Sequence, residues 1–382
     1  MAETEGQAFA AVAARIGRVG PIPFGAYVEA ALSGPGGFFT GGGGAGRRAD
    51  FLTGPELGPL FGAVVARALD REWLRMGRPD PYVVVEAGAG RGALARAVLD
   101  SGPACGPALR YLCAERSPTL QEAARQLLPV EPLANVLGGV GEDDDEDGVP
   151  HAGTGTGPVV AVLDDLPATR FTGVVLANEL LDNLPFDLVE RTASGWDEVR
   201  VGLDGRRLVE VPVGASQELL ADACRLAPEA PLGGRIPLQR DAGAWLARAL
   251  GLLRGGRVIV IDYADTTTSL ASRPWQDWLR TYRGHQRAGH PLDLPGGADV
   301  TCEVAVDQLA VVRAPDRDRT QAGWLRAHGI DELVDAARHA WRAQAHVGGL
   351  SAVAARSRVG EGDALTDPTG LGAFRVLEWQ VD

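Results

Sequence analysis

The chain has 382 residues and contains no lysine: all 37 of its basic residues are arginine. Its 50 acidic residues leave a formal net charge of −13, which argues against binding to nucleic acids or to anionic membranes. The four cysteines show no C-x-x-C spacing, and the six histidines show no H-E-x-x-H pattern. The sequence therefore predicts neither a disulfide framework nor a metal site.

Long apolar runs are also missing. No stretch approaches the roughly 20 apolar residues that a membrane-spanning helix needs, and the acids Glu3 and Glu5 argue against a signal peptide. With the scattered cysteines, these absences predict a cytoplasmic protein. The apolar fraction of 45% still allows a sizeable core, and the length suits one large elaborated domain or two ordinary ones.

The most informative stretch runs from residue 82 to residue 98. It begins with four β-branched or aromatic residues, 82–85, which are typical of a short strand buried on both faces. Glycines follow at Gly88, Gly90 and Gly92, and an alanine-rich segment then favours a helix. Strand, glycine turn and helix form the entrance to nucleotide sites in doubly wound α/β sheets, because the turn lets a ligand approach the backbone. A glycine-rich turn that binds nothing is the alternative.

The spacing of these glycines bears on the ligand. A dinucleotide site favours G-x-G-x-x-G, in which the third glycine eases helix–strand packing, whereas this chain has G-x-G-x-G. The acid Glu86 stands two residues before the first glycine. S-adenosylmethionine carries a sulfonium and an ammonium group where a dinucleotide carries a pyrophosphate, so Glu86 could face that positive charge. The pattern therefore favours S-adenosylmethionine over NAD.

A second strand is expected at residues 108–114, and it leads into Glu115. In nucleoside-binding α/β folds, an acid about 20 residues after the glycine turn accepts hydrogen bonds from the ribose hydroxyls. Glu115 follows Gly92 by 23 positions. We therefore predict that Glu115 binds the ribose of the cofactor.

A short motif near the N-terminus, Thr53-Gly-Pro-Glu56, precedes an apolar-periodic segment at residues 57–74. Threonine and proline are common helix-start residues, and the helix dipole favours an acid in the first turn. Taken alone, the motif is either a plain helix N-terminus or part of a binding site.

The octet Asn178-Glu-Leu-Leu-Asp-Asn-Leu-Pro185 follows directly after a fourth strand expected at residues 172–177. Ligands of open α/β sheets bind outside the carboxyl ends of the strands. Asn178 offers an amide there, and Glu179 and Asp182 offer carboxylates that could hold a cationic or amine-bearing acceptor and take up its proton. We predict these three residues as catalytic; a turn in which they satisfy backbone groups is the alternative.

The rest of the chain is expected to alternate between helices and strands, with a β-meander at residues 186–213 whose hairpin turn is Asp204-Gly205. Residues 264–300 are expected to be irregular, and such long excursions are often functional lids. Tyr282, His285 and Asp299 are the substrate or lid candidates in this region. The acidic run at residues 142–147 is typical of a solvated loop. Helices are expected at 7–19, 24–32, 57–74, 118–128, 216–226, 239–254, 304–312, 321–327, 331–346 and 350–356, and further strands at 159–163, 257–261 and 372–379.

Together these motifs resemble the MidA-like family of S-adenosylmethionine-dependent methyltransferases over nearly the whole length. The resemblance implies a Rossmann-like class I methyltransferase sheet, with S-adenosylmethionine over the glycine turn and Thr53 and Glu56 closing its site. Mitochondrial members of the family methylate an arginine of a respiratory complex I subunit, so a protein arginine is the acceptor that the resemblance favours. The matching segments are 24–39, 50–56, 86–92, 178–185, 260–263, 279–285, 295–301 and 370–374.

The chain also departs from the family pattern. Ala89 stands where proline is usual, Ala264 stands where glycine is usual, and residues 302–306 lack the histidine and aspartate expected there. Two other functions stay open. One is a cofactor-binding assembly factor without catalysis, which the altered segment 302–306 supports, and the other is an NAD-dependent oxidoreductase that uses the same glycine turn. For the organisation of the chain we expect an N-terminal helical extension at residues 1–80 and a methyltransferase domain at 81–382, with insertions around 186–250 and 264–345.

Overall fold

The computed structural model describes residues 2–44, 53–133, 136, 155–344 and 349–382. The chain divides into two compact units. The first unit comprises residues 1–51, 179–248 and 262–315, and the second unit comprises residues 52–178, 249–261 and 316–382. The expected domain boundary at residue 80 stays a prediction. The acidic run at residues 142–147 lies outside the described residues.

The second unit is built on a seven-stranded sheet. Its strands, in sheet order, are β16 (Arg317–Thr320), β17 (Arg375–Val381), β10 (Leu253–Asp262), β5 (Phe171–Asn178), β2 (Tyr82–Ala87), β3 (Leu109–Ala114) and β4 (Val159–Leu163). From β10 to β4 each neighbouring pair is parallel, whereas β16 and β17 pair antiparallel. Counted along the chain from β2, the sheet order is 3-2-1-4-5-7-6, which is a doubly wound arrangement whose order reverses between β2 and β5. The predicted α/β fold class is confirmed.

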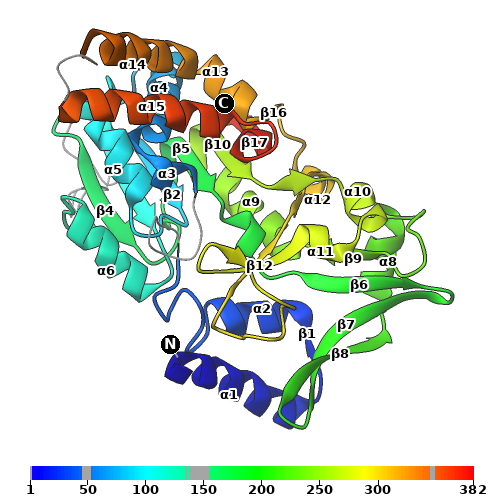
Figure 1. Ribbon diagram of the computed structural model, residues 1–382. Helices are drawn as coiled ribbons and strands as arrows, with labels where there is room; N and C mark the ends of the chain where they lie inside the picture. Colours follow the sequence, from blue (N-terminus) through cyan, green and yellow to red (C-terminus); the bar gives the residue numbers. More distant parts are fainter. Residues whose placement is uncertain (1, 45–52, 134–135, 137–154, 345–348) are drawn as a thin grey trace, which may run out of the picture. The chain divides into compact units, whose positions relative to one another are not determined.

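Helices cover one face of this sheet with a shared apolar core. They are α3 (Gly54–Leu57), α4 (Pro59–Arg75), α5 (Ala93–Asp100), α13 (Gln321–Ala327), α14 (Ile330–Gln344) and α15 (Leu350–Thr366), and α6 (Pro118–Leu127) also belongs to this unit. Phe61 of α4 and Trp324 of α13 are fully buried in a core that also contains Val84 of β2 and Ile259 of β10. Figure 1 shows α14 and α15 running side by side, in agreement with their contacts.

The first unit contains α1 (Ala2–Val19) and α2 (Phe24–Leu32) and three small sheets. The largest sheet joins β1 (Ile22–Pro23), β6 (Asp187–Thr192), β7 (Gly195–Asp204), β8 (Arg207–Gly214) and β9 (Arg235–Leu238), and β7 with β8 forms the long hairpin visible in Figure 1. A second sheet joins β12 (Leu279–Arg283), β13 (Gln286–Arg287) and β14 (Asp299–Cys302), and the third pairs β11 (Ala264–Asp265) with β15 (Val304–Ala305). The helices α8 (Gln217–Leu226), α9 (Arg240–Leu252), α10 (Thr267–Ser272), α11 (Trp275–Trp278) and α12 (Val306–Val312) complete the elements of this region.

Several expected elements are confirmed with small shifts, but residues 264–300 are not the irregular region that the sequence predicts. They contain two short helices and a three-stranded sheet. Trp278 is fully buried, and β12 pairs with β14, which begins 16 residues after β12 ends. Pairing over that separation leaves no local pattern in the sequence, which explains why the prediction was wrong.

Other differences are smaller. The helix expected at residues 57–74 is divided into α3 and α4 at Gly58. The hairpin turn is Gly205-Arg206, because Asp204 pairs with Arg207. The strand β16 was not expected, since its sequence, Arg-Asp-Arg-Thr, has no apolar alternation; charged residues of this kind are common on edge strands.

Candidate functional site

The glycine turn joins β2 to α5. Gly88, Gly90 and Gly92 have φ values of 69°, 56° and 80°, a left-handed conformation that glycine adopts at little steric cost. A Cβ atom on Gly92 would lie 2.7 Å from the side chain of Leu128, so this position is packed. A Cβ atom on Gly90 would meet no atom within 4 Å. The turn is therefore closed by packing at Gly92 and open to a ligand at Gly90.

Glu115, the predicted ribose-binding acid, lies against this turn. Its Oε2 atom accepts a hydrogen bond of 2.9 Å from the backbone N–H of Gly90, and its Oε1 atom accepts one of 2.8 Å from Ser117. Partial burial raises the pKa of Glu115, while these backbone N–H groups oppose that rise. The structure thus brings together the predicted turn and the predicted acid, which come from neighbouring parallel strands.

Glu86 is the penultimate residue of β2 and has only 4% of its surface exposed. Burial raises the pKa of its carboxyl group to about 7, although the hydroxyl of Tyr111 donates to it at 2.7 Å and favours the ionised form. A carboxyl group with a pKa near neutrality can adjust its charge when a cation binds nearby.

Glu56 belongs to α3, which contacts α5, and Thr53 directly precedes that helix. Thr53 is buried and is the N-cap residue of α3, but its side chain makes no capping hydrogen bond. The structure thus places Thr53 at the N-cap and Glu56 in the first turn, as the plain helix N-terminus alternative expects, although the Thr53 side chain does not cap the helix. Its predicted role in closing the cofactor site stays a prediction.

In the first unit, the octet forms a turn that a buried acid holds in place. The turn is η2 (Leu181–Asn183). The Oδ2 atom of Asp262, at the end of β10, accepts hydrogen bonds from the backbone N–H groups of Leu181 (3.0 Å) and Asp182 (3.3 Å). Asp182 is itself buried; its Oδ2 atom accepts from the hydroxyl of Thr301, whereas its Oδ1 atom is buried without a hydrogen-bond partner.

Glu179, Asp182 and Asp262 form what we call the acid cluster. Burial raises the pKa of Asp182 to about 6, against the opposing effect of the Thr301 hydroxyl. Burial, together with the negative charges of Asp182 and Glu179, raises the pKa of Asp262 well above its usual range. A bound cation stabilises the ionised form of a buried carboxyl group whose ionisation is disfavoured by burial and by neighbouring negative charges.

The backbone of Glu179 has a φ of 51°, which is uncommon for a residue other than glycine. Such conformations cost about 1–3 kcal/mol and are often found at functional sites. Glu179 directly follows Asn178, the last residue of β5, which pairs with Ile261 of β10. The structure therefore places Glu179 with Asp182 in the acid cluster, and Asn178 at the carboxyl end of its strand as predicted.

The three lid candidates occupy different positions in the β12–β14 sheet. Asp299 is buried and accepts a hydrogen bond of 3.0 Å from the side chain of Asn183, which connects this sheet to the η2 turn. Tyr282 is half-buried and pairs with Asp299 across the strands. His285 is exposed, with a φ of 63°, in the turn between β12 and β13. Their roles toward a substrate stay predictions.

Asp262 and Thr301 are site residues that were not predicted from the sequence. Asp262 could have been found, because it ends the strand next to β5 and the carboxyl-end rule applies to it equally. Thr301 ends one of the segments that match the family, 295–301, but only the fold brings its hydroxyl to Asp182. The unusual segment after it is well packed: Cys302 is buried, and Glu303 binds Arg273 and Arg280 at 2.6 and 2.5 Å.

Within the described residues, no group of three or more His, Cys, Asp or Glu side chains is arranged to hold a metal ion. Nor does that part of the chain contain a helix with the length and apolar character that a membrane span requires.

The strand order, the open glycine turn and Glu115 define a nucleoside-binding α/β fold. A family described as "Putative S-adenosyl-L-methionine-dependent methyltransferase" matches residues 64–322, which is about two thirds of the chain. The chain belongs to this family of S-adenosylmethionine-dependent methyltransferases. Its donor set fits that cofactor, since Gly90 leaves the backbone open and Glu115 offers a carboxylate at the turn.

Named relatives and a solved structure agree with this assignment. The mitochondrial protein arginine methyltransferase NDUFAF7 homolog of Drosophila melanogaster is 29% identical over 318 residues, which are 76% of this chain and 66% of that protein. The mitochondrial NDUFAF7 of Mus musculus is 26% identical over 375 residues, which are 91% of this chain and 80% of that protein. A crystal structure of a protein from Burkholderia thailandensis bound to S-adenosyl-homocysteine has a TM-score of 0.78 and 26% identity, covering 99% of this chain and 93% of that one.

The sequence-based identification of the family, the activity and the cofactor is therefore confirmed. The chain is similar to about two thirds of the length of the Drosophila relative, so the acceptor named for that protein is not transferred to this chain directly. The relatives are named as mitochondrial proteins, and the cytoplasmic location expected from this sequence stays a prediction.

Proposed function

We propose that this enzyme methylates the guanidinium group of an arginine in a protein substrate. The observation that carries the proposal is the Oδ1 atom of Asp182, which is buried and has no hydrogen-bond partner. An unsatisfied buried acceptor of this kind costs about 1–3 kcal/mol. A guanidinium N–H group would satisfy it with a charge-assisted hydrogen bond.

The charge of the acid cluster supports the same acceptor. The negative charges of Glu179 and Asp182 lie close enough to Asp262 to disfavour its ionisation. A guanidinium is planar, carries five N–H donors and stays protonated in water, so it can bind more than one of these carboxylates. A neutral acceptor would bring no positive charge to Asp182, whose pKa of about 6 leaves it ionised at neutral pH.

S-adenosylmethionine, when bound, supplies a methyl group on a positively charged sulfur, so the protein mainly has to position the acceptor and remove its proton. The pKa of Asp182, about 6, leaves it ionised at neutral pH and able to accept the proton that the guanidinium releases. Gly88, Gly90, Gly92 and Glu115 would hold the cofactor, with Glu86, Thr53 and Glu56 nearby. The relatives' names, which specify protein arginine methylation, support this acceptor.

The test is transfer of a labelled methyl group from S-adenosylmethionine to arginine-containing proteins of a cell extract, followed by mass spectrometry of the labelled band. Asp182→Asn is compared with Glu218→Gln, a control in the same unit that changes an exposed acid paired with Arg240 at 3.0 Å. We expect Asp182→Asn to lower transfer about a hundredfold. The control should transfer normally, and calorimetry should show that both variants bind the cofactor.

Label on lysine or on a small molecule, with none on arginine, would overturn the proposed acceptor. If the wild type binds S-adenosylmethionine but labels nothing in a broad extract, the non-catalytic assembly function gains instead. Equal activity of Asp182→Asn and the control would remove Asp182 from the mechanism.

A further inference from the structure

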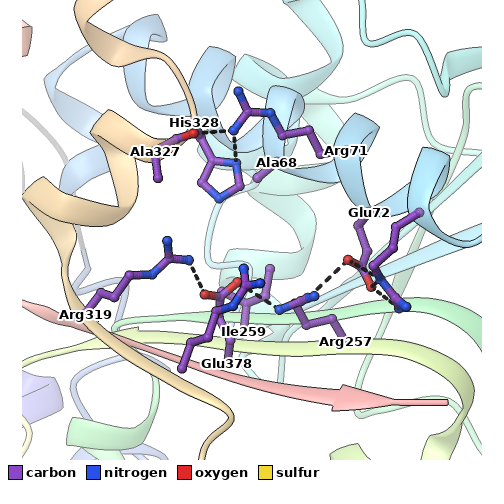
Figure 2. Close-up of a pocket in the computed structure, with 11 residues that line it drawn as sticks. Ala68, Arg71, Glu72, Arg257, Ile259, Arg319, Ala327, His328 and Glu378 are labelled. Carbon is purple, nitrogen blue, oxygen red and sulfur yellow. Dashed lines mark hydrogen bonds and ion pairs between the residues drawn. The ribbon is translucent and has the colours of Figure 1, made fainter.

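A hollow of about 220 Å³ lies in the second unit, between α4, β10, the β16–β17 pair and the residues that follow α13 (Figure 2). Its polar lining consists of five arginines, two glutamates and one histidine. Three apolar residues, Ala68, Ile259 and Ala327, complete the lining. In a chain with a net charge of −13, so many cations around one hollow are unexpected.

The hollow is separate from the glycine turn. Arg257 in its wall pairs with Val174 of β5, and Val174 pairs with Val84 of β2. Gly88 lies four residues after Val84, which corresponds to about 13 Å along the strand. β10 also lies two strands away from β2, or about 10 Å across the sheet. A ligand in the hollow would therefore bind beside the amino-terminal half of the sheet.

Two buried carboxylates, those of Glu72 and Glu378, neutralise part of the positive charge around the hollow. The side chain of Arg257, 7% exposed, lies between Glu72 and Glu378, at 3.1 and 3.4 Å. Arg75 binds the same Glu72 at 2.7 Å, and Arg319 binds the same Glu378. Three arginines thus share two glutamates, and these five side chains alone carry one excess positive charge.

The other two arginines of the hollow, Arg71 and Arg317, have no carboxylate partner within the described residues. Arg71 donates to the carbonyl oxygen of Ala327 and approaches Nδ1 of His328 at 3.5 Å. With His328 neutral, the hollow therefore carries an excess of about three positive charges. In addition, the Nε atom of Arg319 is buried and has no hydrogen-bond partner.

The pKa of His328 reflects the electrostatic field of these arginines. In Figure 2 the ring of His328 lies between Arg71 on one side and the row Arg319, Glu378 and Arg257 on the other. Burial, reinforced by the charges of Arg71, Arg319, Arg257 and Arg317, lowers the pKa of His328 to about 4. The imidazole is therefore neutral at physiological pH, and the arginines dominate the electrostatics of the hollow.

We infer that this hollow is a binding site for a small dianion carrying a phosphoryl group. Guanidinium groups match the oxygen geometry of phosphate and bind it in pairs of hydrogen bonds. The dianion would offset most of the excess positive charge, and one oxygen could accept from the unpartnered Nε of Arg319. The volume of about 220 Å³ leaves room for phosphate itself or for a small phosphate monoester.

The first experiment observes His328 directly in the intact protein. Labelled histidine ring signals are followed by NMR across pH 3–8, with inorganic phosphate or with sodium chloride at matched ionic strength. His328→Gln assigns the signal among the six histidines. Because a bound anion stabilises imidazolium, we expect phosphate to raise the pKa of His328 and chloride to leave it near 4.

The second experiment measures affinity by calorimetry, with inorganic phosphate and phenyl phosphate as probes. Arg319→Ala removes an arginine with a buried, unpartnered Nε, and Arg317→Ala removes an exposed arginine that forms no ion pair within the described residues. Arg338→Ala is the control, since Arg338 lies on α14 outside the hollow and pairs with Asp335 at 3.0 Å. Loss of a charge-assisted hydrogen bond should weaken binding about tenfold or more in the two hollow variants, and not in the control.

The two probes separate the sources of the anion. Tighter binding of phenyl phosphate than of phosphate indicates a phosphorylated metabolite, and the reverse order indicates free phosphate. The proposal is overturned if wild-type protein binds neither probe at millimolar concentration while the pKa of His328 is unmoved, or if Arg338→Ala weakens binding as much as Arg319→Ala. Retained binding of S-adenosylmethionine verifies that each variant is folded.

Discussion

The buried carboxyl group of Glu86 makes the stability of this protein depend on pH in a way that can be calculated. Burial raises its pKa from 4.5 to about 7 in the folded protein. Between these values the folded chain holds a proton that the unfolded chain releases. The contribution of Glu86 to stability is therefore fully present below about pH 4.5 and is lost as the pH rises through about 7.

The substitution Glu86→Gln removes this titration and keeps an oxygen that can accept from the hydroxyl of Tyr111. The difference between 4.5 and about 7 corresponds to about 3 kcal/mol, at 1.36 kcal/mol for each pH unit. Over the accessible interval from pH 5 to pH 8, linkage gives a loss of about 2.5 kcal/mol for the wild type. The variant should show no such loss from this position.

The assay is urea unfolding of the cofactor-free protein, wild type and Glu86→Gln, at pH 5, 6, 7 and 8. We expect the stability of the variant relative to the wild type to increase by about 2.5 kcal/mol across this series. Tyr111→Phe serves as a second check. Removing the hydroxyl that favours the ionised carboxylate should raise the pKa of Glu86 further, so this variant should lose more stability than the wild type between pH 5 and pH 8. A constant difference between Glu86→Gln and wild type at all four pH values would refute the reasoning.

Three further changes test the second unit. Glu115→Gln should weaken binding of S-adenosylmethionine about tenfold in calorimetry, because the amide cannot replace a carboxylate that accepts ribose hydroxyls; unchanged affinity would remove Glu115 from the cofactor site. Gly92→Ala should lower the free energy of unfolding by about 1–3 kcal/mol, and more than Gly90→Ala does, since only the first Cβ meets Leu128; equal losses in urea unfolding would contradict this. Arg257→Met should lower stability by about 3–5 kcal/mol, because it leaves two buried carboxylates short of a partner, and an unchanged Tm would contradict this.

The fold of the second unit could be predicted because its signals are local. The strands β2 and β4 are runs of apolar residues, and a run of this kind is recognisable wherever its neighbours lie. The glycine turn and Glu115 follow their strands directly, so strand order alone predicts that they meet. The contact between Gly90 and Glu115 was therefore within reach of the sequence.

The small sheet of the first unit was out of reach for the opposite reason. Its strands β12 and β14 are only five and four residues long, and the turns between them contain glycine, histidine and proline. What holds them is packing around Trp278 and Leu279, in a core that also contains residues of α2. A segment whose order depends on distant partners looks irregular when its sequence is considered alone.

The acid cluster and the arginine-lined hollow show two different limits of sequence interpretation. Asp262 is at the carboxyl end of a strand, so a stricter use of one known rule would have paired it with Asp182. No such rule predicts the hollow from the sequence, because Arg71, Arg257 and Arg319 come from a helix and two strands that are far apart in the chain. In a protein whose every basic residue is arginine, composition cannot distinguish these three from the 34 others. Only their grouping around two buried glutamates and a neutral histidine does, and for that reason the hollow is where a function unrelated to the glycine turn should be sought.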